Sequence, residues 1–288
     1  MTSVEFQAWL SRVNRPPLVM GVLNVTPDSF SDGGCYAEPE AAAAHARDMA
    51  AAGADIIDIG GESTRPGATR VDADEQIRRV IPALRRIGRD FPIVISVDTT
   101  RAAVAAAALK AGAGIINDIS AGREDPEMFA LAARKGVPII LMHMLGQPAT
   151  MQERPQYGDV VAEVKKFLAG RLAAAVAAGI DEKQVLLDPG IGFGKTTRHN
   201  LLLLKGLGEL KNLGQPLVLG VSRKRFIGQI VGSSDTQSRL LGSAAAVAWS
   251  LANGADVERV HDVGQMRRVV GAISAMRNPD SANFSADS

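Results

Sequence analysis

One pattern recurs along this chain: a short Ala-rich helical stretch, a glycine, and then a β-branched run that ends in polar residues. Five joins show it most clearly, at residues 51–63, 109–120, 133–143, 177–190 and 252–262. Their glycines, which stand where a helix ends in the left-handed conformation, are Gly53, Gly112, Gly136, Gly179 and Gly254. Because the runs are apolar at consecutive positions, they indicate parallel strands that are buried on both faces.

The less regular joins bring the number of predicted strands to eight. They begin near Leu18, Ile56, Ile93, Ile115, Val137, Val185, Leu217 and Val257. The spacing averages about 34 residues, which is room for a strand, a helix and two loops. Eight such α/β units favour a closed (β/α)8 barrel of the TIM type, whereas five or six strands would favour a doubly wound open sheet.

The domain organisation follows from the absence of any Pro- or Ser-rich linker in the 288 residues. We expect one domain over residues 1–288. The barrel should occupy about 18–276, between a short N-terminal extension and a flexible C-terminal tail.

Charge and composition exclude several classes of partner. With 32 Lys and Arg against 31 Asp and Glu, no overall field attracts a nucleic acid or an anionic membrane. No apolar run approaches the ~20 residues of a membrane span. Cys35 cannot form an intrachain disulfide, and the N-terminus lacks the pattern of a signal peptide. We therefore expect a cytoplasmic protein whose partners are small molecules, with no nucleic acid and no membrane.

Nearly every predicted strand ends in residues that can take part in chemistry. In chain order they are Asn24, Thr26, Glu62, Ser63, Thr64, Arg65, Asp98, Thr99, Asn117, Asp118, Met142, His143, Asp188, Ser222, Lys224, Arg259 and His261. Any one of them could simply cap a helix or satisfy a loop. In a barrel, however, the carboxyl ends of all strands share one rim, so the set should converge on one pocket.

Three of these residues point to a ring-shaped ligand. Asp98, Asn117 and Asp188 lie within or just beyond apolar runs, where an unpaired carboxylate costs several kcal/mol and needs a partner. A ring with N–H groups could be that partner. Carboxylates and amides suit the donor-rich edge of an amino-oxo-pyrimidine, and a lysine can donate to its carbonyl.

A second group is cationic and suits a phosphate or pyrophosphate. It consists of Arg65, Lys224, Arg259 and His261. The last three fall near strands seven and eight, where TIM barrels often bind phosphate groups. Arg223 and Arg225 flank Lys224 and are expected to face solvent or to form salt bridges elsewhere.

Two other motifs carry less weight. Residues 189–196, PGIGFGKT, resemble a P-loop, but Pro189 occupies the position of the first required glycine, so nucleotide hydrolysis is disfavoured. We expect Gly190, Gly192 and Gly194 to let this loop approach a ligand. The four histidines lack the spacing of a zinc site.

The same residues carry a family resemblance. MGVLNVTPDSFSDGG (20–34) and DIIDIGGESTRPGA (55–68) resemble the two signature segments of the dihydropteroate synthases. SVDTT, IINDISA, LLDPGIGFGK, GVSRKRFIG and RVHDV match later segments of that family in order. The resemblance implies a TIM barrel that joins 6-hydroxymethyl-7,8-dihydropterin pyrophosphate to p-aminobenzoate, giving 7,8-dihydropteroate and pyrophosphate.

The resemblance also implies roles for individual residues. The residues implied to bind the pterin are Asp98, Asn117, Asp188, Lys224, Ile119 and Met142. The residues implied to bind the pyrophosphate are Thr64, Arg65, Arg259 and His261. Those implied for p-aminobenzoate are Phe30, Pro66, Phe193 and Ser222. Asp98, Lys224, Arg65 and Asp32 would be catalytic, and Asn24 would ligate Mg²⁺. A homodimer is implied too, and the helix expected over 241–252 could be its contact surface or could pack on the barrel.

The chemistry suggests a route with separated charge. An aniline nitrogen is a weak nucleophile, so we expect Mg²⁺-assisted departure of pyrophosphate first and attack of the amine on a pterin-stabilised cation second. Two alternatives stay open. A pterin-binding methyltransferase barrel would share the Asp and Asn residues without needing the cationic cluster, and a non-catalytic pterin-binding paralogue should have lost loop residues such as Asp32 or Arg65.

Overall fold

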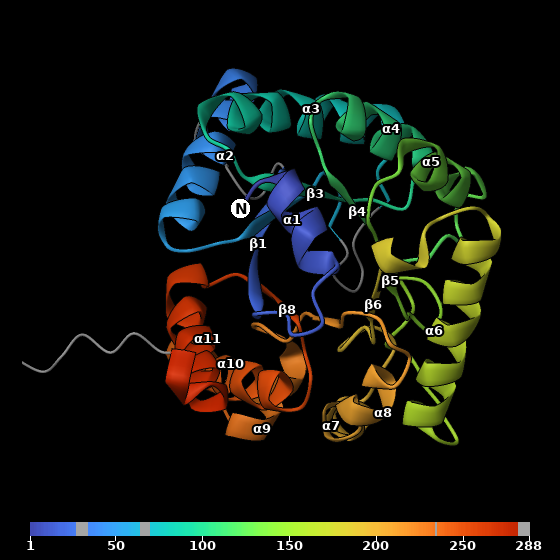
Figure 1. Ribbon diagram of the computed structural model, residues 1–288, viewed down its shortest axis with the longest axis vertical. Coiled ribbons are helices and arrows are strands. Elements are labelled where there is room, and N and C mark those ends of the chain that lie inside the picture. Colours follow the sequence, from blue (N-terminus) through green and yellow to red (C-terminus); the bar gives the residue numbers. More distant parts are fainter. Residues whose placement is uncertain (27–33, 64–69, 234, 282–288) are drawn as a thin grey trace, which may run out of the picture.

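Eight parallel strands, each followed by helix, surround a common axis in the computed structural model (Figure 1). The structure describes residues 1–26, 34–63, 70–233 and 235–281. The strands are β1 (Leu18–Asn24), β2 (Ile56–Gly60), β3 (Val94–Asp98), β4 (Ile115–Asp118), β5 (Ile139–Met142), β6 (Val185–Asp188), β7 (Val218–Leu219) and β8 (Val257–Val260). Each begins within two residues of its predicted start, which confirms the periodicity.

The helices lie outside the strands, with one exception described below. The α-helices are α1 (Ser3–Leu10), α2 (Gly34–Ala51), α3 (Ala73–Asp90), α4 (Ala102–Lys110), α5 (Glu127–Lys135), α6 (Val160–Ala177), α7 (Thr197–Lys205), α8 (Leu207–Lys211), α9 (Arg225–Val231), α10 (Thr236–Ala252) and α11 (Val263–Arg277). Two short 3-10 helices are η2 (Glu182–Gln184) and η3 (Pro279–Ser281). Gly136, with φ 60°, ends α5 in the left-handed conformation, as the repeated join predicts.

The sheet closes almost completely. Its strand order is β6-β5-β4-β3-β2-β1-β8-β7. At the remaining seam, Leu187 and Leu217 form a parallel bridge, and the Leu187 N–H donates to the Pro216 carbonyl at 3.0 Å. The closed (β/α)8 barrel is therefore confirmed, and the open-sheet alternative is wrong.

The interior of the barrel has two halves: a lower, apolar half at the amino ends of the strands and an upper, polar half at their carboxyl ends. Inward-facing residues near the amino ends of the strands form one apolar cluster: Leu18, Met20, Ile56, Val94, Ile115, Ile140, Leu186, Val218 and Val257. Above them, towards the carboxyl ends, the buried side chains include Asp58, Ser96, Asp98, Asn117 and Asp188. Polar groups thus gather at the rim where the sequence predicts a pocket.

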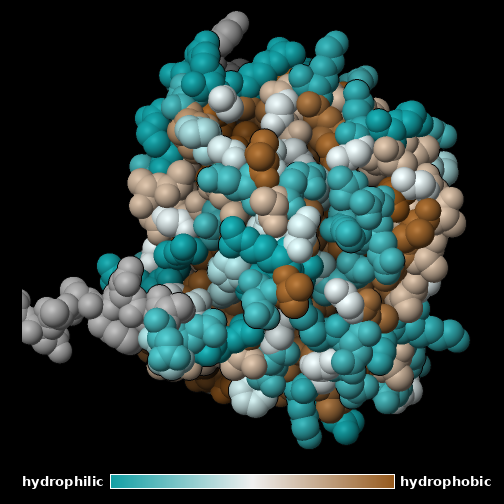
Figure 2. Space-filling view, in the orientation of Figure 1, coloured by the Kyte–Doolittle hydropathy of each residue, from teal (hydrophilic) through white to brown (hydrophobic). Residues whose placement is uncertain are grey.

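The N-terminal extension closes the amino end of the barrel. In Figure 1, α1 crosses the centre of the ring of strands. Phe6, Trp9 and Leu10 are buried in the lower apolar cluster, and the Trp9 indole donates to the Pro16 carbonyl at 2.8 Å. The opposite side of α1 is exposed, and hydrophilic residues cover most of this face of the molecule (Figure 2). The extension is thus part of the core.

No helix among the described residues is long and apolar enough to cross a membrane.

Removing the buried indole of α1 should destabilise the whole barrel. Trp9 is 1% exposed, so Trp9→Ala should lower the free energy of unfolding by about 3–5 kcal/mol through lost burial and a residual cavity. Urea unfolding followed by circular dichroism measures the change. Val13→Ala, at a position 94% exposed, is the control and should stay near the parent value. Equal free energies of unfolding for the two variants would contradict the conclusion that α1 is part of the core.

Candidate functional site

A cleft of about 340 Å³ opens at the carboxyl ends of the strands. It is lined by Asp98, Asn117, Ile119, Met142, Asp188, Gly190, Ile191, Phe193, Gly220, Lys224 and Arg259. All six residues predicted to bind the ring are in this set. Five of them lie at or just beyond the carboxyl ends of the adjacent strands β3 to β6, and closure of the barrel at the seam between β6 and β7 brings Lys224, in the loop after β7, beside them.

Strand register places the acceptors of the cleft beside one another. Asp98 pairs with Asn117 across β3 and β4, and Met142 pairs with Asp188 across β5 and β6. Inward-pointing positions alternate along each strand, so these paired residues share the inner face. Two carboxylates and one amide therefore surround a single space.

A charged network crosses the barrel beneath the cleft. The Arg259 guanidinium donates through Nε to Asp58 Oδ2 at 2.6 Å and through Nη2 to Asp98 Oδ2 at 2.8 Å. Asn117 Nδ2 also donates to Asp58 Oδ2, at 3.1 Å. Four strands are thereby joined by side chains, and the guanidinium offsets the cost of burying two carboxylates.

Burial changes the acidity of both carboxyl groups in the cleft. Burial raises the pKa of Asp98 to about 7, although the nearby charge of Arg259 acts in the opposite direction. Burial raises the pKa of Asp188 to about 6, against the hydrogen bond that the Gly190 N–H donates to Asp188 Oδ1 at 2.7 Å. Both groups thus titrate near neutral pH, as is common at functional sites.

The lysine of the cleft lies against an aromatic ring. Lys224 Nζ is 4.1 Å from the centroid of the Phe193 ring, a cation–π contact. Burial, followed by repulsion from Arg259, lowers the pKa of Lys224 to about 8. The ammonium is therefore held as a donor over the space between Phe193 and Asp188.

The remaining wall of the cleft is apolar. Ile119, Met142, Met144, Met151 and Phe193 form a separate buried cluster at this end of the barrel. Flat apolar walls with a few convergent polar groups are the usual form of a small-molecule site. The arrangement suits a planar heterocycle with several N–H donors and one carbonyl.

Two of the predicted anion-binding residues, Arg259 and His261, are described at the end of β8. Arg259 lines the cleft, while the backbone N–H of His261 donates to Ser222 Oγ at 3.3 Å. Burial, then repulsion from Arg259, lowers the pKa of His261 to about 4. The flanking Arg223 forms an ion pair with Asp262, and Arg225 is exposed, which confirms the expectation for both.

Several predicted site residues fall outside the described part of the chain. They are Phe30, Asp32, Thr64, Arg65 and Pro66. Asn24 is described and ends β1, where it is half-buried and pairs in register with Gly60.

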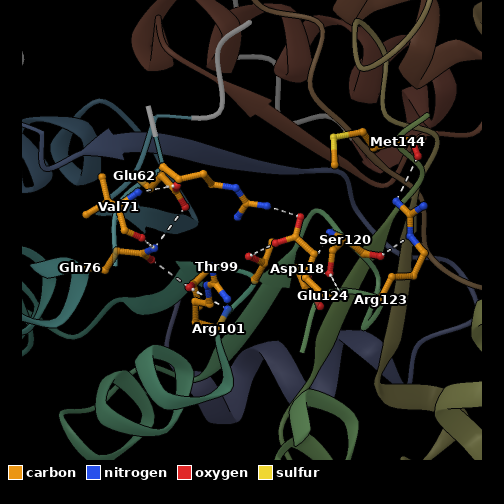
Figure 3. Close-up of polar contacts among 12 residues, drawn as sticks. Glu62, Val71, Gln76, Thr99, Arg101, Asp118, Ser120, Arg123, Glu124 and Met144 are labelled. Atoms are coloured by element: carbon orange, nitrogen blue, oxygen red, sulfur yellow. Dashed lines mark hydrogen bonds and ion pairs between the residues drawn. The ribbon is translucent and has the colours of Figure 1, made fainter. Parts of the chain in front are cut away.

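Hydrogen bonds join the loops around one side of the rim (Figure 3). Glu62 accepts from the Val71 N–H at 2.9 Å and from Gln76 Nε2 at 3.1 Å, and Thr99 Oγ1 donates to Gln76 Oε1 at 3.1 Å. Farther along, Arg123 donates to the Ser120 carbonyl at 2.8 Å and the Met144 carbonyl at 3.0 Å. These hydrogen bonds link the described parts of the loops after β2 and β3 to α3, and the loop after β4 to the loop after β5.

The glycine-rich segment after β6 is held by a buried lysine. Lys195 Nζ lies 2.8 Å from His143 Nδ1 and donates to the carbonyls of Gly190 (2.9 Å) and Phe193 (3.0 Å). This lysine is 3% exposed and therefore does not serve as the phosphate-binding lysine of a P-loop.

Two glycines of this segment, Gly190 and Gly194, pack closely against the loop after β5. A Cβ added at Gly190 would meet the His143 carbonyl oxygen at 1.9 Å, and one at Gly194 would meet the Leu145 carbonyl oxygen at 2.5 Å. Both have positive φ, 65° and 63°. These two glycines allow close packing against the loop after β5; Gly190 also lines the cleft.

Asp58 is the site residue that sequence reasoning missed. It is fully buried and contacts two predicted site residues. Its signal was present: a carboxylate stands within the apolar run IIDIG, the same argument that selected Asp98.

Fold and cleft together define an α/β-barrel enzyme with a buried site for a flat, nitrogen-rich ring. A family model described as pterin binding enzyme matches residues 20–261. The dihydropteroate synthase of Synechocystis is 47% identical over 258 residues, which cover 90% of this chain and 89% of that protein. The chain belongs to the pterin-binding enzymes and, among them, to the dihydropteroate synthases.

Solved structures agree with this assignment. Xanthomonas albilineans dihydropteroate synthase with 4-aminobenzoic acid has a TM-score of 0.86 and 47% identity, and the match covers 93% of this chain and 94% of that one. The same enzyme in complex with 7,8-dihydropteroate has a TM-score of 0.83 and 44% identity, with 93% and 95% covered.

The Lys195 contacts should be important for stability. Lys195→Met removes the donor of the buried Phe193 carbonyl and one of the two donors of the Gly190 carbonyl, which keeps the Phe193 N–H, so the free energy of unfolding should fall by about 1–3 kcal/mol. Chemical denaturation measures the change. Lys205→Met, at an exposed position on α7, is the control. A Lys195→Met protein as stable as this control would show that the contacts contribute little.

Proposed function

We propose that the chain condenses 6-hydroxymethyl-7,8-dihydropterin pyrophosphate with p-aminobenzoate to form 7,8-dihydropteroate and pyrophosphate, a step of folate biosynthesis. The observation that carries the proposal is the cleft in which Asp98, Asn117 and Asp188 face the same space as Lys224 and an apolar wall. Membership of the dihydropteroate synthases supports the same reaction.

The acceptors of the cleft match the pterin. Its amino group and ring N–H groups are donors, and the carboxylates of Asp98 and Asp188 accept without competing protons when they are ionised. Lys224 donates to the ring carbonyl. Ile119, Met142 and Phe193 cover the flat faces of the ring and exclude water from them.

Charge separation is the demanding part of the reaction. As pyrophosphate departs, positive charge spreads into the dihydropterin ring, and the buried carboxylate of Asp98 stabilises it. Arg259, at the end of β8, attracts the leaving anion through its charge, and the neutral ring of His261 beside it can donate one N–H to it. The amine of p-aminobenzoate then attacks the methylene carbon and loses its proton, so no covalent bond to the protein is required.

Magnesium fits the site only together with the substrate. Among the described residues, no group of three or more His, Cys, Asp or Glu side chains could hold a metal ion. Asn24 would supply one neutral oxygen at the rim, and Mg²⁺ commonly takes its other ligands from water and phosphate oxygens. When bound there, the ion would offset charge on the departing pyrophosphate.

The decisive test supplies the pterin pyrophosphate, p-aminobenzoate and Mg²⁺ to the folded protein. Dihydropteroate and pyrophosphate should appear in equal amounts. Chromatography detects the dihydropteroate, and a coupled phosphate assay detects the pyrophosphate. Absence of both products would refute the proposal. Methyl transfer from a methylated folate to a corrinoid, assayed in parallel, would instead favour the methyltransferase alternative.

Asp98→Asn sharpens this test. Loss of a charge that acts mainly in the transition state should lower kcat about 100-fold while pterin affinity falls less than about tenfold.

In the parent enzyme, kcat/KM should fall as pH drops below about 7, because protonation removes the Asp98 charge. In the variant this limb should move towards the pKa of Asp188, about 6. Asp74→Asn, exposed on α3, is the control.

A homodimer is the oligomeric state that the surface favours. Exposed large apolar side chains gather on three helices in contact: Leu201 and Leu202 on α7, Ile230 and Val231 on α9, and Leu241 and Trp249 on α10. Such a patch on neighbouring helices is suited to a second copy related by a two-fold axis.

Light scattering after gel filtration tests the dimer. The parent chain should have twice the monomer mass, and Leu241→Glu should be monomeric because it places a charge in the contact. Val4→Glu, at a position 79% exposed on α1, should remain dimeric. A monomeric parent chain at micromolar concentration would exclude the dimer.

A further inference from the structure

Asp58 is a fully buried carboxylate that touches the site without lining the cleft. It lies in the middle of β2 and faces the barrel interior. Its Oδ2 atom accepts two hydrogen bonds, from Arg259 Nε at 2.6 Å and from Asn117 Nδ2 at 3.1 Å. Its Oδ1 atom is buried and has no hydrogen-bond partner among the described residues. All of its hydrogen bonds thus run to residues that line the cleft.

The Asp58 carboxylate dictates which way the Asn117 amide points. The two ends of an amide have nearly the same shape but opposite hydrogen-bonding character. The NH₂ end of Asn117 faces Asp58, whose Oδ2 accepts from it and from the Arg259 guanidinium. The amide oxygen is therefore directed away from Asp58, on the side of the cleft.

We propose that Asp58 is a positioning residue for substrate specificity: it holds the Asn117 amide oxygen towards the bound ring and so selects a 2-amino pterin over its 2-oxo analogue. The inference rests on the proposed function and extends it to the choice of substrate. With the amide held this way, Asp98, Asp188 and Asn117 all present acceptors. The 2-amino group donates to such a rim, whereas a 2-oxo group would bring a further acceptor against it.

Arg259 connects the orientation of the amide to the charges of the cleft. The guanidinium binds Asp58 and Asp98 at the same time, so it holds the Asp58 carboxylate directly below the cleft. An asparagine at position 58 would have nearly the size of the aspartate, but it would no longer require the NH₂ end of Asn117 to face it. An amide there could donate to the Asn117 oxygen, which would turn the Asn117 NH₂ group towards the ligand.

The test is Asp58→Asn in the intact chain, with binding measured by calorimetry. The probes are 6-hydroxymethylpterin and the matching 2-oxo compound, a 6-hydroxymethyl-lumazine. The preference of the parent protein for the 2-amino compound should fall about tenfold in the variant, the effect of one hydrogen bond. The KM for p-aminobenzoate should change less than twofold, because Asp58 does not touch that part of the cleft. An unchanged preference in folded Asp58→Asn protein would overturn the proposal.

Glu258 offers a matched control. It is also fully buried, it accepts a hydrogen bond from Ser250 Oγ through one oxygen, and its other oxygen has no partner among the described residues. It does not line the cleft. Glu258→Gln should therefore alter stability while leaving the preference for the 2-amino compound intact. An equal loss of preference in both variants would mean that Asp58 acts only through general stability.

A measurement on the parent protein covers the case in which Asp58→Asn does not fold. With ¹⁵N-labelled asparagine, and with Asn117→Asp for assignment, one Asn117 side-chain proton should resonate downfield and remain so when 6-hydroxymethylpterin binds. Movement of that proton to the ordinary amide position on binding would refute the orienting role. Failure of the proposed function would look different, since neither compound would then bind the parent protein.

Discussion

The buried guanidinium of Arg259, shared between Asp58 and Asp98, is the interaction on which the site depends. It lies inside the barrel, where two carboxylates alone would repel each other and lose hydration. By neutralising them it permits a polar upper layer above an apolar one. The acceptors that line the cleft can then stand on rigid strands instead of on loops, which keeps them in fixed positions.

The division of the interior explains how one barrel is both stable and chemically active. Stability comes from the amino-terminal half, where α1 adds Phe6 and Trp9 to the inward-facing side chains of the strands. The carboxyl half holds buried polar groups that need partners, among them Asp98 and Asp188 with raised pKa values. A ligand rich in N–H donors supplies such partners. The near-neutral net charge of the whole chain therefore conceals a polarised interior.

Much of the fold and part of the site followed from local sequence patterns. The eight strands were predicted because buried parallel strands and helix-ending glycines have short-range signals. Asp98, Asn117 and Asp188, which line the cleft, were predicted because a polar residue within an apolar run needs a partner. Asp58 satisfied the same argument but was passed over, and Lys195 was taken only as part of an incomplete P-loop. The partners of both lie elsewhere in the sequence, so their roles had no local signal.

The sequence by itself determined that strands and helices alternate, that eight units close into a barrel and that polar residues converge on one rim. These properties depend on hydrophobic periodicity and on backbone preferences of single residues, which act over a few positions. Only the tertiary structure decided that α1 fills the amino end and that Arg259 joins Asp58, 201 residues away, to Asp98. Barrel closure brings β8 beside β1 and across from β3, and side-chain contacts between such distant strands arise only then.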